Sequence, residues 1–221
     1  MTNISRDFNL FRKDRGISGV AMHDYQKIMM GHINPYVIEE RQMNITQLDI
    51  YSRLLMDRII FLGSGIDDTV GNIITAQLLF LSSIDNEKPI QLYISSGGGS
   101  VVAGLSIYDT MEFIPNDVNT MVTGMAASMA FILSISGSHR SALKNARLMM
   151  HQPSGGAEGV SMDLEIATNE IVKIRKVLYD IIAEKTKHTY DEVFKSCERD
   201  NWLSASEALS YGALDEIITK K

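Results

Sequence analysis

Cysteine is nearly absent from this sequence, which contains Cys197 alone and therefore cannot form an internal disulfide. A lone thiol fits a reducing compartment, and the Cys and His spacings typical of zinc and iron–sulfur sites do not occur. The longest apolar runs fall far short of the ~20 residues that a membrane-spanning helix requires. The first residues lack the continuous apolar core of a secretory signal. These absences predict a cytoplasmic protein with no metal and no membrane association.

Positive charge is also scarce, because 27 Asp and Glu residues outnumber 21 Lys and Arg residues and give a formal net charge of -6. Binding to a phosphate backbone needs clustered basic residues, so nucleic acid is not expected as a partner. The length of 221 residues, with 45% hydrophobic side chains, is that of one globular domain. Residues 1–33 show no sustained hydrophobic period and are interpreted as an N-terminal arm or removable leader. Residues 34–221 then form the folded domain.

Helical and strand-like hydrophobic patterns alternate from residue 46 onward. Thr46, with Asp49 three positions later, is expected to open the first helix, and Asp67 or Asp68 the second. Further helices are expected over residues 101–114, 126–135, 162–187, 191–197 and 204–211. Strands are expected over residues 59–63, 90–95, 118–123, 146–151 and 214–219. The alternation predicts an α/β fold with a largely parallel sheet covered by helices.

One of five histidines is placed where it could act as a general base, which a serine nucleophile needs at neutral pH. His23 and His32 lie in the N-terminal arm, His139 in a polar turn, and His188 at a helix end. His151 follows the apolar residues of the string MMHQP, so that a strand would deliver its ring to the rim of a sheet. His151 is therefore the candidate base.

Ser128 lies in the string TGMAASMA, where a strand is expected to give way to a helix. The first turn of a helix offers unpaired N–H groups and a positive dipole end, which would stabilise an alkoxide. The same string could instead be a small-residue helix start that packs closely on a sheet. Asp200 lies between two predicted helices and could face a histidine ring, or serve as a cap or a solvated charge.

The glycine-rich run SSGGGSV, residues 95–101, follows a strand and precedes a helix. Backbone amides in this context can point at an anion, so the run could form an oxyanion hole. It could also be a bare turn or a phosphate cradle, but the Lys-Ser/Thr ending of a P-loop is missing and the spacing G-x-G-x-x-G is not matched.

Seven strings, taken together and in this order, resemble the proteolytic subunits of the Clp protease family. They are DIYSRLLMDRIIFLG, IQLYISSGGGSV, IYDTM, TGMAASM, ARLMMHQPSGG, ERDNWLSASEA and YGALDEI. The resemblance extends from about residue 36 to the last predicted strand. It implies that Ser128 attacks the peptide carbonyl, that His151 takes its proton, and that Asp200 holds the histidine tautomer.

The resemblance also implies an oxyanion hole made by the N–H groups of Gly99 and Met129, with Gly98 in a supporting position. It implies an α/β, crotonase-like spiral of β-β-α units with a protruding handle helix that begins near Met162. Glu198 and Arg199 match an acidic and basic pair that links ring contact to the geometry of the catalytic residues.

The implied assembly is a homo-oligomer of two stacked seven-membered rings, a tetradecamer with an internal proteolytic chamber. An AAA+ unfoldase such as ClpX, ClpA or ClpC would feed unfolded polypeptides into it. ATP would be used by that partner, so no cofactor is expected in this chain.

Three departures from the family pattern stand out. Gly97 replaces a proline, which loosens the turn before the oxyanion donors. The turn over residues 137–142 is about two residues shorter than usual, so that its hairpin should differ. The segment GAEGVS replaces one that commonly contains glutamine.

Two other functions remain open from the sequence. The crotonase fold also serves acyl-CoA thioesters, although the set of Ser, His and Asp argues against that chemistry. A catalytically silent ring subunit is the other alternative, but such chains usually lack one of the three residues.

Overall fold

A computed structural model describes residues 36–41, 44–156 and 158–219. The chain divides into two units, residues 1–53 and 54–221. In the first unit, β1 (Tyr36–Arg41) pairs antiparallel with β2 (Asn44–Asp49). Residues 1–33, with His23 and His32, lie outside the described residues, so the proposed domain boundary at residue 34 stays a prediction.

α3 (Ile50–Met56) begins directly after β2. The Asp49 carboxylate accepts the backbone N–H of Ser52 at 3.0 Å, as a residue at a helix start commonly does. The prediction that the helix starts at Thr46 is wrong, because Thr46 pairs with Glu39 in the β1–β2 ladder. The β-branched residues of the NITQLD segment favour a strand there.

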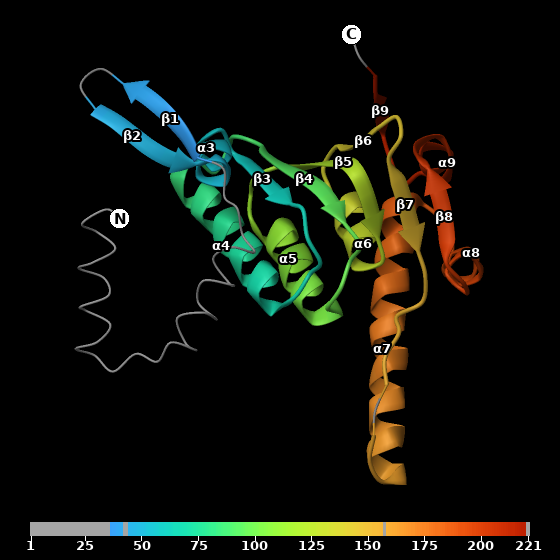
Figure 1. The fold of residues 1–221 in the computed structure, drawn as a ribbon. Helices are drawn as coiled ribbons and strands as arrows, with labels where there is room; N and C mark the ends of the chain where they lie inside the picture. The colour runs from blue at the N-terminus through green and yellow to red at the C-terminus, as the bar shows by residue number, and fades with distance from the viewer. Residues whose placement is uncertain (1–35, 42–43, 157, 220–221) are drawn as a thin grey trace, which may run out of the picture. The chain divides into compact units, whose positions relative to one another are not determined.

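The second unit is built on a seven-stranded sheet (Figure 1). Its main path runs β3–β4–β5–β6–β9 with parallel neighbours, and β7 pairs with β5 in parallel and with β8 antiparallel. The strands are β3 (Ile59–Leu62), β4 (Ile90–Ser96), β5 (Val118–Ala127), β6 (Arg140–Leu143), β7 (Arg147–Met150), β8 (Asn201–Ser204) and β9 (Glu216–Ile218). The prediction of a largely parallel sheet is confirmed, with β8 as the exception.

The helices that accompany the sheet start and end at local signals. They are α4 (Asp68–Ile84), α5 (Val101–Phe113), α6 (Met129–Ile135), α7 (Ser161–Thr186), α8 (Tyr190–Ser196) and α9 (Ala205–Tyr211). The Asp67 side chain caps α4, and a capping box starts α9 at Ser204. α4 and α5 lie side by side, and a Cβ added at Gly71 would lie 3.0 Å from the Cβ of Ala103 (Figure 1).

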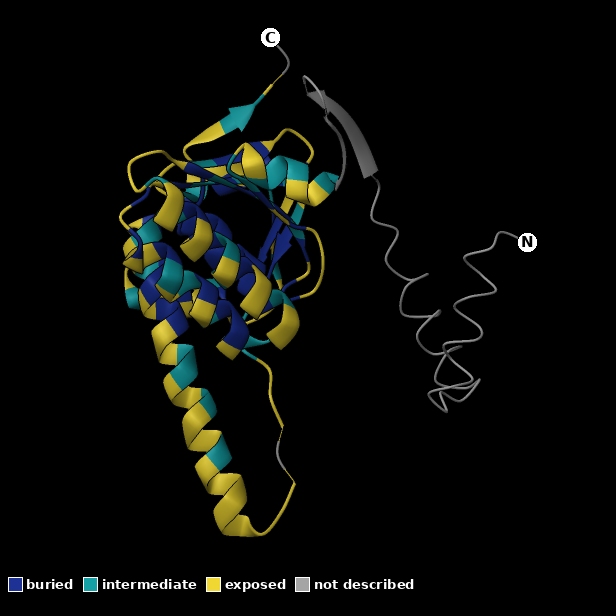
Figure 2. Cartoon of the chain, turned by 90° about the vertical axis from the view of Figure 1, so that its left-hand side faces the viewer, coloured by how far each residue is buried: buried dark blue, intermediate teal, exposed yellow. Residues whose placement is uncertain are grey.

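α7 has two different halves. Its buried residues all lie in the C-terminal part, from Leu178 to Thr186, where it packs on the core. The N-terminal part projects away from the sheet, and its surface is largely exposed (Figure 2). The prediction of a protruding helix is confirmed.

Two predicted boundaries are corrected by strand pairing. The helix expected from residue 126 starts at Met129, because Ala126 and Ala127 continue β5 and pair with Leu148 and Met149 of β7. The turn over residues 137–142 does not close a hairpin. Its second half belongs to β6, which is parallel to both β5 and β9.

Arg140 connects β6 to the C-terminal part of the chain. Its Nε donates to the Asp215 carboxylate at 3.0 Å, and its Nη1 donates at 2.8 Å to the carbonyls of Lys185 and Gly212. The side chain is 14% exposed, so most of its charge is shielded from water. The bond from Arg140 lowers the pKa of Asp215 below its ordinary 3.8.

We expect Asp215→Asn to lower the free energy of unfolding by about 1 to 2 kcal/mol at pH 7, the typical worth of a partly exposed, charge-assisted bond. Because the folded-state pKa of Asp215 is depressed, its contribution is complete above the ordinary 3.8 and is lost as pH falls through the lower folded value. Thermal unfolding at fixed protein concentration should therefore show the two proteins converging in strongly acidic buffer. A gap that stays constant with pH would contradict this role for the carboxylate.

Candidate active site

Ser128 occupies a sharp turn between β5 and α6. Its φ of 57° and ψ of -123° lie in a region that residues other than glycine rarely adopt, at a cost of roughly 1–3 kcal/mol. The turn is held because the Ser128 N–H donates to the Met149 carbonyl at 2.9 Å and the Ser128 carbonyl accepts the Phe131 N–H at 3.0 Å. A strained strand-to-helix turn of this kind presents a nucleophile at the edge of a sheet.

β7 delivers His151 beside this turn. β7 is parallel to β5, with Ala127 opposite Met149, so the residues that follow the two strands emerge together. The Nε2 atom of His151 lies 2.8 Å from the Oγ of Ser128. The ring is 24% exposed, which leaves a path for a substrate.

β8 delivers Asp200 to the other side of the ring. β8 runs antiparallel to β7 with Asn201 opposite Met150, so Asp200 comes to lie opposite His151. The Oδ1 atom of Asp200 lies 3.0 Å from His151 Nδ1. An ionised carboxylate only accepts, so Nδ1 carries the proton and Nε2 is left as the acceptor for the Ser128 hydroxyl. The arrangement can move a proton from Oγ to the imidazole.

The glycine-rich turn after β4 lies against the Ser128 turn. Gly98 has φ +89°, and a Cβ there would lie 2.5 Å from the Ala127 carbonyl oxygen and 2.9 Å from the Met129 nitrogen. Gly99 has φ +149°, and its Cβ would meet the Ile66 carbonyl oxygen at 2.2 Å. Only glycine fits either position.

This close approach brings the peptide groups around Gly98 next to the start of α6. Met129 is the first residue of α6, so its N–H has no intrahelical acceptor. The two predicted oxyanion donors, Gly99 and Met129, therefore belong to segments that meet at Ser128.

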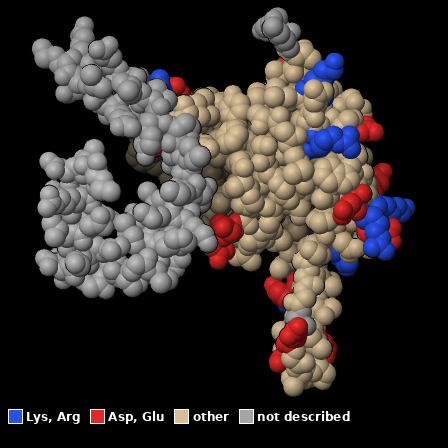
Figure 3. All heavy atoms as spheres, in the orientation of Figure 1, with Lys and Arg blue, Asp and Glu red and all other residues tan. Residues whose placement is uncertain are grey.

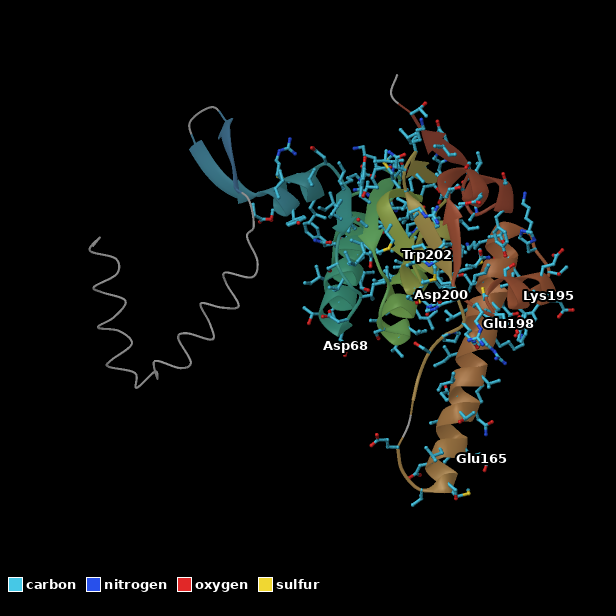
Figure 4. All side chains as sticks on the ribbon, turned by 45° about the vertical axis from the view of Figure 1, so that its right-hand side comes forward. Asp68, Glu165, Lys195, Glu198, Asp200 and Trp202 are labelled. Carbon is cyan, nitrogen blue, oxygen red and sulfur yellow. The ribbon has the colours of Figure 1, made fainter. Side chains whose placement is uncertain are left out.

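Glu198 and Arg199 lie on the exposed segment that joins α8 to β8, directly before Asp200. Figure 4 labels Glu198 and Asp200 on this segment. The Glu198 carbonyl accepts a hydrogen bond of 3.1 Å from Gln152 Nε2. Gln152 follows His151, so this bond ties the segment that carries Asp200 to the one that carries the histidine. No local pattern in the sequence marks Gln152 as part of the site.

An apolar pocket opens beside Ser128 and His151. Its other lining residues are Val101, Met129, Phe131, Ile132, Met150, Pro153, Leu178 and Ile182. They come from three helices and a strand end, and in the sequence they are indistinguishable from core residues. The pocket gives the Ser128 hydroxyl a largely apolar surrounding.

Within the described residues, no cluster of three or more His, Cys, Asp or Glu side chains could hold a metal ion. The helices described there include none long and apolar enough to cross a membrane. Cys197 is buried, and burial raises the pKa of its thiol to about 12.

The mixed α/β fold and the Ser128, His151 and Asp200 contacts together are those expected of a hydrolase that uses a serine nucleophile. A sequence model of the Clp protease family matches residues 41–221. A protein of Bacteroides thetaiotaomicron is 52% identical over 211 residues, which cover 95% of this chain and 96% of the relative. A protein of Porphyromonas gingivalis is 50% identical over 207 residues and 93% of each chain. Both are named ATP-dependent Clp protease proteolytic subunit.

The chain therefore belongs to the Clp protease family, which confirms the resemblance of its seven strings. It is a serine peptidase, and its mixed α/β fold is the crotonase-like fold of that family.

Gly98 has no room for a Cβ, so a substitution there should disturb the Ser128 turn. We expect Gly98→Ala to lower kcat/KM by about 10-fold or more, because a strained or displaced turn costs roughly 1–3 kcal/mol. Gly97→Ala is the matched control: its Cβ would lie 3.7 Å from Met125 Cε, an ordinary contact. We expect it to raise the free energy of unfolding by about 0.4–1 kcal/mol by restricting the unfolded chain.

Peptide hydrolysis and thermal unfolding of both variants check the pair. Equal activity for Gly98→Ala and the parent protein would show that the approach of this turn to Ser128 is not needed.

Proposed function

We propose that this chain is the proteolytic subunit of an ATP-dependent Clp protease that hydrolyses peptide bonds of unfolded proteins. The proposal rests on the chain of two hydrogen bonds that connects Ser128 to Asp200 through His151. His151 Nε2 lies 2.8 Å from Ser128 Oγ, and His151 Nδ1 lies 3.0 Å from Asp200 Oδ1. Ser128 lies beside an apolar pocket and beside the glycine-rich turn, whose backbone N–H groups could hold an oxyanion. Acyl transfer from a peptide requires both a substrate site and such donors.

In the proposed reaction, Ser128 Oγ attacks the peptide carbonyl while His151 Nε2 takes its proton. The imidazolium that forms is stabilised by Asp200 and then protonates the leaving amine. Water, activated by the same histidine, releases the acyl group from Ser128. Asp200 keeps Nδ1 protonated throughout, so Nε2 is always the atom that exchanges protons with the substrate.

The tetrahedral oxyanion would be held by the N–H groups of Gly99 and Met129. Their positions are supported by the contact of Gly98 with the Ser128 turn and by the place of Met129 at the start of α6. Donors of this kind are worth roughly 3–4 kcal/mol each where single ones have been removed from proteases.

We further propose a homo-oligomer of two stacked heptameric rings. Exposed apolar side chains at Val160, just before α7, and at Met162 and Ile166 on its projecting part support contact between rings. The uncovered middle of the view in Figure 3 shows few charged side chains, and on α5 the side chains of Phe113 and Val102 are 80% and 72% exposed. Such a face supports contact between neighbours within a ring. Glu198 and Arg199 would link these contacts to Asp200.

The relatives are named ATP-dependent, which supports a partner that uses ATP. We propose that this partner is an AAA+ unfoldase that supplies unfolded chains, so this chain itself would need no cofactor. The single cysteine and the family support a cytoplasmic location.

We expect Ser128→Ala to lower hydrolysis of short fluorogenic peptides by about 10³-fold or more, because removal of the nucleophile disables the whole set of residues. Ser83→Ala, an exposed serine on α4, is the matched control and should keep parental activity. Degradation of a folded protein should require an unfoldase and ATP.

A fluorophosphonate should label Ser128 in the parent protein and leave the Ser128→Ala variant unlabelled. Parental hydrolysis no faster than that of Ser128→Ala would refute the peptidase assignment of this serine. Binding of CoA without labelling would point instead to acyl-CoA chemistry.

A further inference from the structure

The position of the Asp200 carboxylate is set by the backbone that carries it more than by side chains packed around it. Its side chain is 65% exposed, and the bond to His151 links it to a ring that is itself only partly buried. Water surrounds most of the carboxylate, so packing around it fixes little. The position of Asp200 therefore depends on the two elements that flank it in the chain, β8 and α8.

On the C-terminal side, the β7–β8 ladder fixes Asn201 opposite Met150. On the N-terminal side, α8 has seven residues, of which Val193 alone is buried. Cys197 follows it and donates its N–H to the Val193 carbonyl at 2.9 Å. A helix this short does not hold its own position, so its docking on a neighbouring element matters.

Besides the residue that it buries in the core, α8 contacts α7 through an aromatic cluster of Tyr179 on α7 with Tyr190 and Phe194 on α8. Tyr179 is 1% exposed, and its ring centre lies 5.9 Å from those of both other rings, at 85° to Phe194. Arg175 lies over Phe194 at 5.3 Å, and Lys176 over Tyr190 at 5.8 Å. Edge-to-face rings and cations over ring faces favour one relative placement of the two helices.

Phe194 is central to this cluster because it contacts both aromatic residues and Arg175. Its side chain is 40% exposed, so Phe194 is not an ordinary core residue. From Phe194 the chain reaches Asp200 after one helical turn and the short segment 197–199. This segment contains the buried Cys197 and the Glu198 carbonyl that accepts from Gln152, so a shift of α8 on α7 would move these groups and the carboxylate together.

We infer that Phe194 is a positioning residue for Asp200, acting through the placement of α8 on α7. The inference rests on the proposed function, in which Asp200 keeps His151 in the productive tautomer and orientation. Loss of the ring would leave Ser128 and the substrate pocket unchanged, since Phe194 does not line that pocket. The effect should therefore fall on kcat and spare KM.

The test is a double-mutant cycle with the full chain, using Phe194→Ala and Asp200→Asn alone and together. We expect Phe194→Ala to lower kcat about 10- to 100-fold with KM within about twofold, because small misplacements of catalytic groups have effects of this size. In the Asp200→Asn background the same substitution should change kcat less than about twofold, since residues that act through one another are not additive. Phe194→Tyr keeps the aromatic ring, and its kcat should stay close to that of the parent protein.

Leu209→Ala is the matched control, because Leu209 is 39% exposed on the neighbouring α9. It should leave kcat unchanged. Native mass measurement of each variant reports assembly, and Phe194→Leu, which keeps apolar volume but lacks the ring face, replaces the alanine variant if that one fails to fold.

Equal losses from Phe194→Ala in both backgrounds, an unchanged kcat, or a loss that follows the assembled fraction would each overturn the inference. Full activity of Asp200→Asn alone would instead refute the proposed role of Asp200, so the two failures are distinguishable.

Discussion

The strained turn at Ser128 is the constraint on which the rest of the site depends. A non-glycine residue at φ 57° is costly and persists only because neighbouring segments hold it. Met149 of β7 accepts the Ser128 N–H, and Gly98 packs so closely on the turn that a Cβ has no space. The same contacts that hold the turn bring the histidine strand and the glycine-rich amides to it. The proposed nucleophile, base and anion donors are therefore assembled by one local packing arrangement.

Strand register extends this arrangement to the third residue. β7 is the shared element: its parallel pairing with β5 sets His151 beside Ser128, and its antiparallel pairing with β8 sets Asp200 beside His151. The shift of a strand by one residue would turn these side chains to the opposite face of the sheet. Two further contacts hold the segment that precedes Asp200. Gln152 donates to the Glu198 carbonyl, and α8 contacts α7 through Tyr179 and Phe194. The exposed carboxylate thus owes its place to backbone pairing.

Local signals in the sequence were enough for most helices and for the short apolar strands β3 and β7, but not for β6 and β8. Asp67 and Ser204 cap α4 and α9 as their spacing predicts. β6 (RSAL) and β8 (NWLS) mix polar and apolar residues over four positions, and their pairing partners lie outside the neighbouring sequence. Asp200 illustrates the limit: no local pattern places it near His151, and the family resemblance supplied that candidate. The apolar pocket was missed because its residues look like ordinary core.

A structure of the assembled protein after reaction with a peptide boronic acid would show whether Ser128 is the nucleophile. We expect a bond from boron to Ser128 Oγ, with His151 still between Ser128 and Asp200. One boronate oxygen should lie within hydrogen-bonding distance of the N–H groups of Gly99 and Met129, about 2.7–3.1 Å away. A boronate bonded to another residue, or an oxygen that faces solvent away from both amides, would refute these assignments.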